Sequence, residues 1–207
     1  LVAGSFMNFV AGFLITVLFV SLAFGYVPST SLSGFAEGCP YEGADALQAG
    51  DRFYSIDGER VYINSDITLL LERSSTQVYD IVVVRDGKKV KLNDFELKRV
   101  DYDGEMKYGF LFPTGEKTVG NILSYSWQQC RDFARLVRLG LQDLITGRAG
   151  INDMSGPVGI VSVVTEAGKQ SKSVAQGVLT VLYFFAFISV NLGVMNLLPI
   201  PALDGGR

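Results

Sequence analysis

Residues 6–24 read FMNFVAGFLITVLFVSLAF, and this run determines the fold class. Its length is close to the ~20 apolar residues that an α-helix needs to cross ~30 Å of hydrocarbon. The wider segment 1–36 contains no Asp, Glu, Lys or Arg. We therefore expect a membrane-spanning helix that ends near Tyr26, Val27 and Pro28, where an interfacial aromatic residue precedes a helix breaker.

The opposite end of the chain repeats this pattern. Residues 173–203 also lack charged side chains, and residues 173–198 predict a second spanning helix. Between the two ends lie 17 of the 18 basic and 20 of the 21 acidic residues of the 207-residue chain. A soluble protein distributes its charges along amphipathic elements, so this distribution predicts a polar domain between two membrane helices. The expected fold is an α-helical membrane protein with an inserted α+β domain.

The composition excludes several classes of protein. The net charge of −3 argues against a nucleic-acid surface, which is normally basic. Two cysteines, Cys39 and Cys130, are too few for a disulfide framework or a thiolate zinc site, and the sequence leaves their redox state open. The absence of a starting Met and the stop directly after a Gly-Gly pair lead us to expect a fragment of a longer protein.

The middle of the chain alternates short strands with turns. Strands are expected at 51–56 and 59–63 around Asp57-Gly58, and at 79–85 and 89–92 around Asp86-Gly87. A short helix is expected at 66–73, with Ser65 as its N-cap. The expected segments are a transmembrane helix at 1–28, a linker at 29–34, a β-rich domain at 35–100, a linker at 101–117, an amphipathic helical segment at 118–147, a Gly-Pro loop region at 148–172 and a second transmembrane helix at 173–207.

The segment 118–147 has an apolar face and a basic face. Arg131, Arg135 and Arg138 are spaced three or four residues apart, so they share one side of the helix. Such a helix with aromatic residues lies on a membrane surface in one interpretation, and packs against the β-rich domain in the other.

The β-rich domain resembles a PDZ domain of bacterial membrane proteases. The resemblance rests on residues 46–52 (ALQAGDR) and 56–61 (IDGERV), followed by the helix and the hairpin. The sequence departs from the family pattern at Asp45-Ala46 and at residues 38–40. The resemblance implies that a peptide or substrate segment binds at a strand edge, with Gly50 and Asp51 among the substrate-binding residues. The alternative is a domain that acts only as a spacer or gate.

The end of the second apolar helix carries the chemistry. Residues 196–205 read NLLPIPALDG, and Pro199 and Pro201 cannot both lie inside a regular helix. Irregular backbone at membrane depth is tolerated only where protein or a wet cavity surrounds it. A carboxylate in that setting is costly, so Asp204 is a candidate functional residue. The alternative is that Asp204 lies at the interface and caps the next helix.

The complete pattern Asn-x-x-Pro-x-Pro-x-Leu-Asp-Gly resembles the signature of the site-2 protease family of intramembrane metalloproteases. Residues 155–160 (SGPVGI) and a PDZ-like insert between membrane helices match bacterial members of the regulator of sigma-E protease type. The resemblance covers essentially the whole chain. It implies a zinc metalloendopeptidase whose Zn²⁺ is bound by two histidines of an upstream His-Glu-x-x-His motif and by the aspartate of Leu-Asp-Gly.

Few of these functional residues carry over to this chain. Asp204 matches the metal ligand, whereas the general base is expected upstream, so no catalytic residue is assigned here. Asn196, Pro199 and Pro201 match positions that shape or line the substrate channel. The chain contains no histidine, and we expect it to be inactive alone.

The resemblance also implies partners and location. The substrate is a transmembrane protein such as an anti-sigma factor, and no nucleic acid is involved. The protein is a multi-pass protein of the inner or plasma membrane, with the PDZ-like domain extracytoplasmic. The alternatives are a membrane-anchored PDZ scaffold and an inactive pseudoprotease. A transporter or channel would call for a repeated broken helix, which this sequence lacks.

Overall fold

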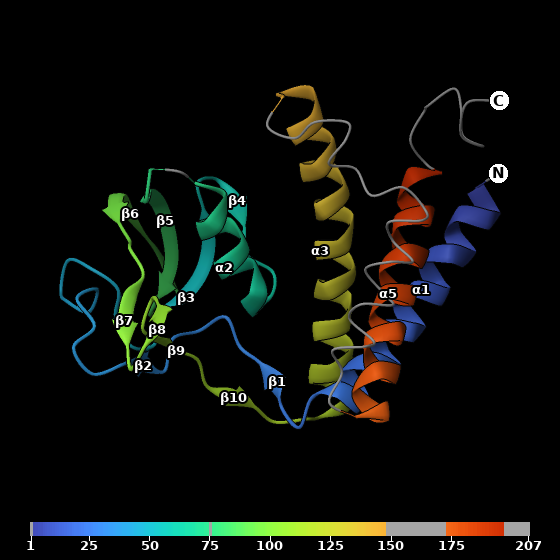
Figure 1. Ribbon diagram of the computed structural model, residues 1–207, viewed down its shortest axis with the longest axis horizontal. Helices are drawn as coiled ribbons and strands as arrows, with labels where there is room; N and C mark the ends of the chain where they lie inside the picture. Colours follow the sequence, from blue (N-terminus) through green and yellow to red (C-terminus); the bar gives the residue numbers. More distant parts are fainter. Residues whose placement is uncertain (1, 75, 148–172, 197–207) are drawn as a thin grey trace. The chain divides into compact units, whose positions relative to one another are not determined.

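The chain forms two compact units in a computed structural model that describes residues 2–74, 76–147 and 173–196 (Figure 1). The helical unit comprises Leu1–Gly25 and Thr118–Arg207, and the β-rich unit comprises Tyr26–Lys117. The described helices of the helical unit are α1 (Val2–Ala23), α3 (Val119–Ile145) and α5 (Val174–Met195).

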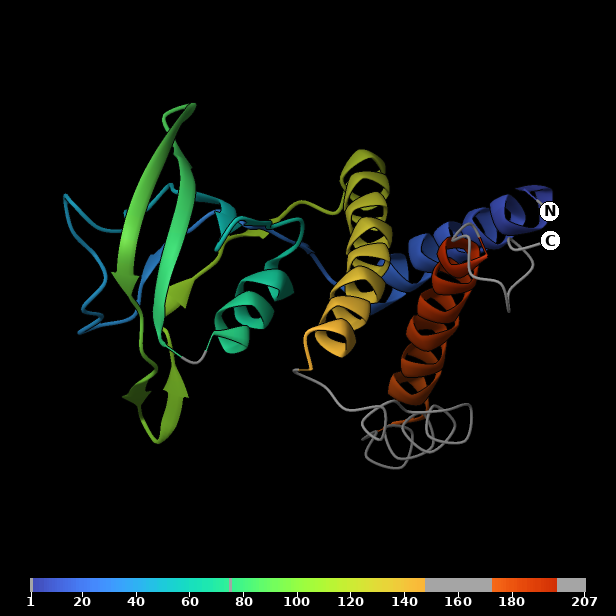
Figure 2. The ribbon, with the colours of Figure 1, turned by 90° about the horizontal axis from the view of Figure 1, so that it is seen from above.

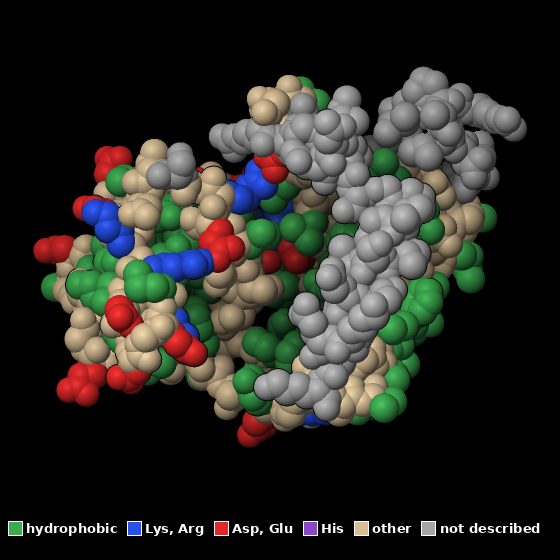
Figure 3. All heavy atoms as spheres, in the orientation of Figure 1, with side chains coloured by type: hydrophobic (Ala, Val, Ile, Leu, Met, Phe, Trp, Pro, Cys, Tyr) green, Lys and Arg blue, Asp and Glu red, His purple; other side chains and the backbone are tan. Residues whose placement is uncertain are grey.

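Helices α1 and α5 are each long and apolar enough to cross a membrane. Only 17% of the most apolar window of each is buried, so neither is the enclosed core helix of a soluble unit. Figure 3 shows the same contrast in side-chain character, with charged side chains gathered over the β-rich unit and hydrophobic ones over α1. These observations agree with the two spans expected from the sequence.

The three helices lie side by side, and glycine permits their close approach (Figures 1 and 2). A Cβ on Gly12 of α1 would lie 2.7 Å from Val190 Cγ2 and 3.0 Å from the Val190 backbone nitrogen. A Cβ on Gly193 of α5 would lie 3.0 Å from the Ser5 carbonyl oxygen. Small residues at these crossings let the two backbones approach each other, as membrane helix pairs require.

We expect Gly12→Ala to destabilise the helical unit by about 1–3 kcal/mol, because the added methyl group overpacks the α1–α5 contact. Gly4→Ala is the matched control, since a Cβ there has no neighbour within 4 Å. Thermal unfolding of both variants in detergent micelles measures the difference. Equal unfolding temperatures would contradict the packing described here.

Helix α3 packs against α1 and α5 through an aromatic face. The Trp127 ring contacts those of Phe9 and Phe13 edge-on at centroid distances of 5.9 and 6.2 Å. The Phe133 ring contacts Tyr183 and Phe187 at 5.4 and 5.3 Å. The sequence did not predict this partner, because its pattern identifies an apolar face without identifying the surface that covers it.

The proposed basic face of α3 is only partly exposed. Arg131 and Arg138 are exposed, whereas Arg135 is buried and forms an ion pair with Asp132. The helix begins where the Thr118 hydroxyl accepts a hydrogen bond from the Asn121 N–H at 3.2 Å.

The β-rich unit is built around a four-stranded antiparallel sheet of order β4-β3-β5-β6. Helix α2 and three small strand pairs (β1 with β10, β2 with β9, and β7 with β8) complete it. The elements are β1 (Val27–Pro28), β2 (Gly34–Phe35), β3 (Arg52–Ile56), β4 (Glu59–Arg60), α2 (Asn64–Arg73), β5 (Val78–Arg85), β6 (Lys88–Glu96), β7 (Val100–Tyr102), β8 (Glu105–Lys107), β9 (Phe110–Leu111) and β10 (Thr114–Gly115).

The core of this unit lies between the inner face of the sheet and α2. Its largest fully buried side chains include Tyr79 and Phe53. The Tyr79 hydroxyl donates a hydrogen bond to the Leu71 carbonyl at 2.6 Å, and burial raises the pKa of Tyr79 to about 12. The hydroxyl therefore stays protonated at neutral pH and joins β5 to the last turn of α2.

Two details of the β-rich unit differ from expectation. Residues 101–117 were expected to be a linker, but they carry β8, β9, β10 and most of β7, and two of these strands pair with residues 27–28 and 34–35. Helix α2 has Ile63 rather than Ser65 at its N-cap. The Asp66 carboxylate accepts the N–H groups of Tyr62 and Ile63 at 2.6 and 3.0 Å, so it satisfies donors that precede the helix.

Candidate functional site

The C-terminal end of α5 leads into the residues expected to carry the chemistry. Asp204, Pro199 and Pro201 lie outside the described residues. Asn196 is the C-cap of α5, with helical dihedral angles (φ −70°, ψ −15°), and its N–H donates to the Leu192 carbonyl at 3.0 Å. The helix therefore stays regular up to Asn196, the first residue of the motif. Just before it, Gly193 packs closely against Ser5 of α1 and fixes this end of α5 against that helix.

A second asparagine on α5 adds to this end of the helix. The side-chain oxygen of Asn191 is buried and has no hydrogen-bond partner among the residues that the structure describes. A buried amide oxygen without a partner costs about 1–3 kcal/mol, so the Asn191 oxygen calls for a donor that the described residues do not supply. In the sequence, Asn191 is a polar residue near the end of an apolar segment.

The donor set of this chain is too small for a catalytic zinc ion. No group of three or more His, Cys, Asp or Glu side chains that could hold a metal occurs within residues 2–74, 76–147 and 173–196. Catalytic zinc takes three protein ligands and keeps one open position. Asp204 supplies one carboxylate at most, and the chain has no histidine.

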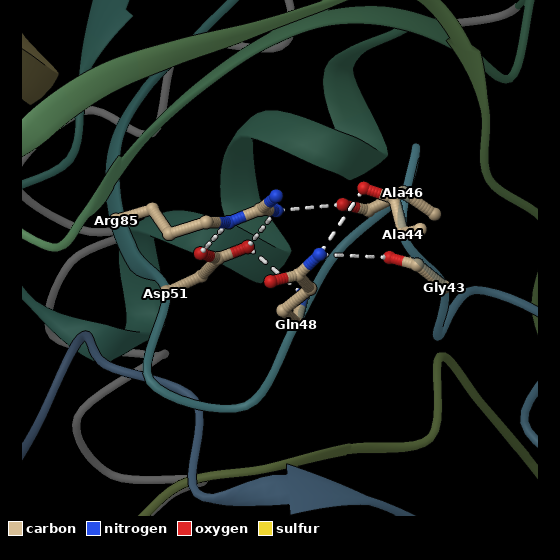
Figure 4. Close-up of polar contacts among 6 residues, drawn as sticks. All are labelled: Gly43, Ala44, Ala46, Gln48, Asp51 and Arg85. Atoms are coloured by element: carbon tan, nitrogen blue, oxygen red, sulfur yellow. Dashed lines mark hydrogen bonds and ion pairs between the residues drawn. The ribbon is translucent and has the colours of Figure 1, made fainter.

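Asp51 lies in a buried polar cluster with Arg85 and Gln48 (Figure 4), and the exposed Gly50 directly precedes it. The Asp51 side chain is fully buried. Its two carboxylate oxygens accept the Nε and Nη2 groups of Arg85, each at 2.8 Å, and one also accepts the Gln48 N–H at 2.9 Å. The Arg85 Nη2 donates in addition to the Ala46 carbonyl at 2.7 Å. This network joins the loop before β3 to the end of β5.

The cluster gives these two residues a structural role in the loop. The hydrogen bonds to Asp51 raise the pKa of Arg85 above its ordinary value, so the guanidinium group stays charged. Gly50 has φ +95°, a conformation that favours glycine, and its N–H donates to the Leu32 carbonyl at 2.8 Å. Both residues shape the loop, and the buried carboxylate is not accessible to a peptide.

A groove of about 740 Å³ lies elsewhere in the β-rich unit, between α2 and the strands that follow β6. Ile67 and Thr68 line it on the helix side, and Gly109, Phe110 and Leu111 line it on the β9 side. The sequence did not predict this groove, because residues 101–117 were expected to be a linker.

Strand β9 has an open edge beside this groove. Within the described chain it pairs with β2 alone. The carbonyls of Gly109 and Leu111 accept the N–H groups of Ala36 and Ser33, each at 2.8 Å. Main-chain groups of successive strand residues point in opposite directions, so those of Phe110 point away from β2. An extended segment could therefore add to β9 at this edge.

Comparison with known proteins places these features in a family. The model of peptidase family M50 matches residues 1–207. The regulator of sigma-W protease RasP of Bacillus subtilis is 31% identical over 207 residues, which are 99% of this chain and 47% of that protein. The zinc metalloprotease RasP of Shouchella clausii is 34% identical over 207 residues, again 99% of this chain and 47% of that protein.

A clostridial relative extends the comparison. The putative zinc metalloprotease CPE1693 of Clostridium perfringens is 31% identical over 218 residues, covering 99% of this chain and 58% of that protein. The chain thus spans about half the length of the curated relatives it matches. Because the family model extends over the entire sequence, the chain belongs to peptidase family M50, the site-2 proteases.

Proposed function

We propose that the protein containing this chain is an intramembrane zinc metalloprotease that cleaves membrane proteins in regulated intramembrane proteolysis. The match of all 207 residues to peptidase family M50 carries the proposal. Relatives named zinc metalloproteases support it, and they do not favour a PDZ scaffold or a pseudoprotease.

Within this activity, Asp204 is the one zinc ligand that the chain contributes. The other ligands and the general base belong to parts of the protein outside residues 1–207. The zinc ion supplies Lewis-acid activation of water when it is bound. Asn196, Pro199 and Pro201 shape the substrate site.

The β-rich unit acts in this proposal as a PDZ-like domain that binds an extended segment of the substrate. The open edge of β9 and the groove beside α2 support this role. The regulator function in the name of the Bacillus relative suggests a transmembrane anti-sigma factor as substrate. We place the protein in the plasma membrane as a multi-pass protein, with the β-rich unit outside the cytoplasm.

Metal removal tests the proposed activity. We expect the intact protein, purified in detergent, to stop cleaving a model transmembrane substrate when 1,10-phenanthroline is added, and to recover when Zn²⁺ is restored. The non-chelating 1,7-isomer is the control and should leave cleavage unchanged. Cleavage that persists after the zinc has been removed would contradict a zinc-dependent mechanism.

A further inference from the structure

The four-stranded sheet of the β-rich unit has two different faces. Helix α2 packs on one of them, where Phe53, Ile81 and Val83 are buried in a shared core with the helix. The neighbouring residues of each strand point the other way, because side chains alternate along a strand. Val82 and Val84 are accordingly only half-buried. We call the face on which these two valines lie the outer face.

The strand register gathers cations on the outer face. Two rows of paired residues cross it: the first is Arg52, Val84 and Lys89, and the second is Arg60, Ser55, Val82 and Lys91. Neither row contains a carboxylate, and each carries two basic side chains. We call Arg52, Arg60, Lys89 and Lys91 the basic patch.

An aromatic ring stands among these cations. Tyr54 lies where the register of β3 against β5 shifts. The Arg60 guanidinium carbon lies 3.4 Å from the centre of the Tyr54 ring, and the Lys89 Nζ lies 3.8 Å from it. The hydrogen bond with Lys89 and the charge of Arg60 lower the pKa of Tyr54. The ring therefore stands in a positive potential that β4 and β6 supply together.

The charge of the basic patch is largely uncompensated. Arg52, Lys89 and Lys91 are exposed, and within residues 2–74, 76–147 and 173–196 none of them forms an ion pair. By contrast, the exposed Lys98 and Lys107 are paired with nearby glutamates. A flat face with several unpaired cations calls for a partner that presents many negative charges over an area.

The chain itself keeps this face near a bilayer. Helix α1 ends at Ala23, and Ser31, eight positions later, forms a bridge with Arg52 of the basic patch. An extended chain of that length spans at most about 29 Å. The headgroups around the end of α1 are therefore present at a high effective concentration, whereas a soluble acidic partner has no such advantage. This tether favours the lipid surface as the occupant.

We propose that the basic patch binds the anionic headgroups of the bilayer that α1 spans, so that the outer face of the sheet rests on the membrane surface. The inference goes beyond the proposed function and depends on α1 as a membrane span. Each Lys or Arg close to an anionic surface strengthens binding by about fivefold. Long basic side chains and a tyrosine suit the headgroup region, because their stems and ring are apolar and their tips polar.

Lysine reactivity in nanodiscs tests this contact. The full chain is reconstituted in nanodiscs of phosphatidylcholine alone or of phosphatidylcholine mixed equally with phosphatidylglycerol, and brief acetylation is quantified by mass spectrometry. We expect Lys89 and Lys91 to react several-fold more slowly in the anionic nanodiscs, and raised salt should weaken this protection. Lys88 is the internal control, since it is exposed on the same strand but alternates to the opposite side. It should react equally in both.

Two variants connect the protection to the basic patch. Arg52→Gln combined with Lys91→Gln removes two of the four cations, so Lys89 should return to about its reactivity in neutral nanodiscs. Lys88→Gln removes one charge from the same strand without touching the patch, and it should leave the protection of Lys89 unchanged.

Several results would overturn the proposal. Lys89 that reacts equally in the two kinds of nanodisc does not contact headgroups. Equal slowing of Lys88 and Lys89 would indicate a general effect of the charged surface rather than a bound face. Protection of Lys89 by soluble polyglutamate, without any by phosphatidylglycerol, would assign the patch to an acidic polypeptide instead. These readouts do not depend on cleavage, so the proposed protease activity is tested separately.

Discussion

Replacing Asp204 by Ala in the intact protein is expected to reduce cleavage of a transmembrane substrate by at least ~100-fold. Loss of a residue that only supports a metal ligand already costs up to ~100-fold in activity, and loss of a ligand itself should cost no less. The reason is coordination. Catalytic zinc uses three protein ligands, and this chain contains no histidine that could take the place of the carboxylate. Zinc content should fall together with activity.

Two measurements separate loss of the ligand from loss of the fold. Metal analysis of the purified variant reports zinc occupancy, and thermal unfolding reports whether the protein remains folded. Asp45→Ala is the matched control, because Asp45 is exposed in a loop of the β-rich unit and should keep both zinc and activity. A folded Asp204→Ala protein that cleaves at the wild-type rate would show that Asp204 is not a ligand.

The sequence was sufficient where a local pattern determines the structure. The two charge-free ends predicted α1 and α5, because a span of ~20 apolar residues is a requirement that few other structures impose. The turn at Asp86-Gly87 was predicted as well, because this residue pair is typical of a two-residue hairpin turn. Both residues adopt the positive φ that such a turn requires (48° and 76°).

The sequence was insufficient where distant segments meet. Strands β2 and β9 are two residues each and pair Phe35 with Phe110, so they show no alternation that a window of sequence could detect. The groove beside β9 was missed for the same reason. The loop Gly50-Asp51 was identified as important, but a carboxylate in a turn looks the same whether it binds a ligand or an internal arginine. Asp204 was identified by its motif, and its role as a ligand stays a prediction.

The buried Asp51–Arg85 pair carries the largest expected effect on stability. We expect Asp51→Ala to lower the free energy of unfolding of the β-rich unit by about 3–5 kcal/mol, because it leaves the Arg85 guanidinium without its carboxylate. Arg85 is only 19% exposed, so water cannot fully replace the lost partner. The Gln48 N–H loses its acceptor at the same time. Hydrogen exchange of β5 and β6 in urea, measured on the full chain in micelles, reports this change.

A double-mutant cycle shows whether the pair itself is responsible. Arg85→Met removes the stranded charge, so adding it to Asp51→Ala should cost little or restore stability, whereas Arg85→Met alone should destabilise the unit by leaving Asp51 buried and unpaired. Asp45→Ala, in the same loop but exposed, should stay within about 0.5 kcal/mol of the parent. Additive effects of the two substitutions would show that Asp51 and Arg85 act independently. The buried carboxylate would then stabilise the loop chiefly through its hydrogen bond with Gln48.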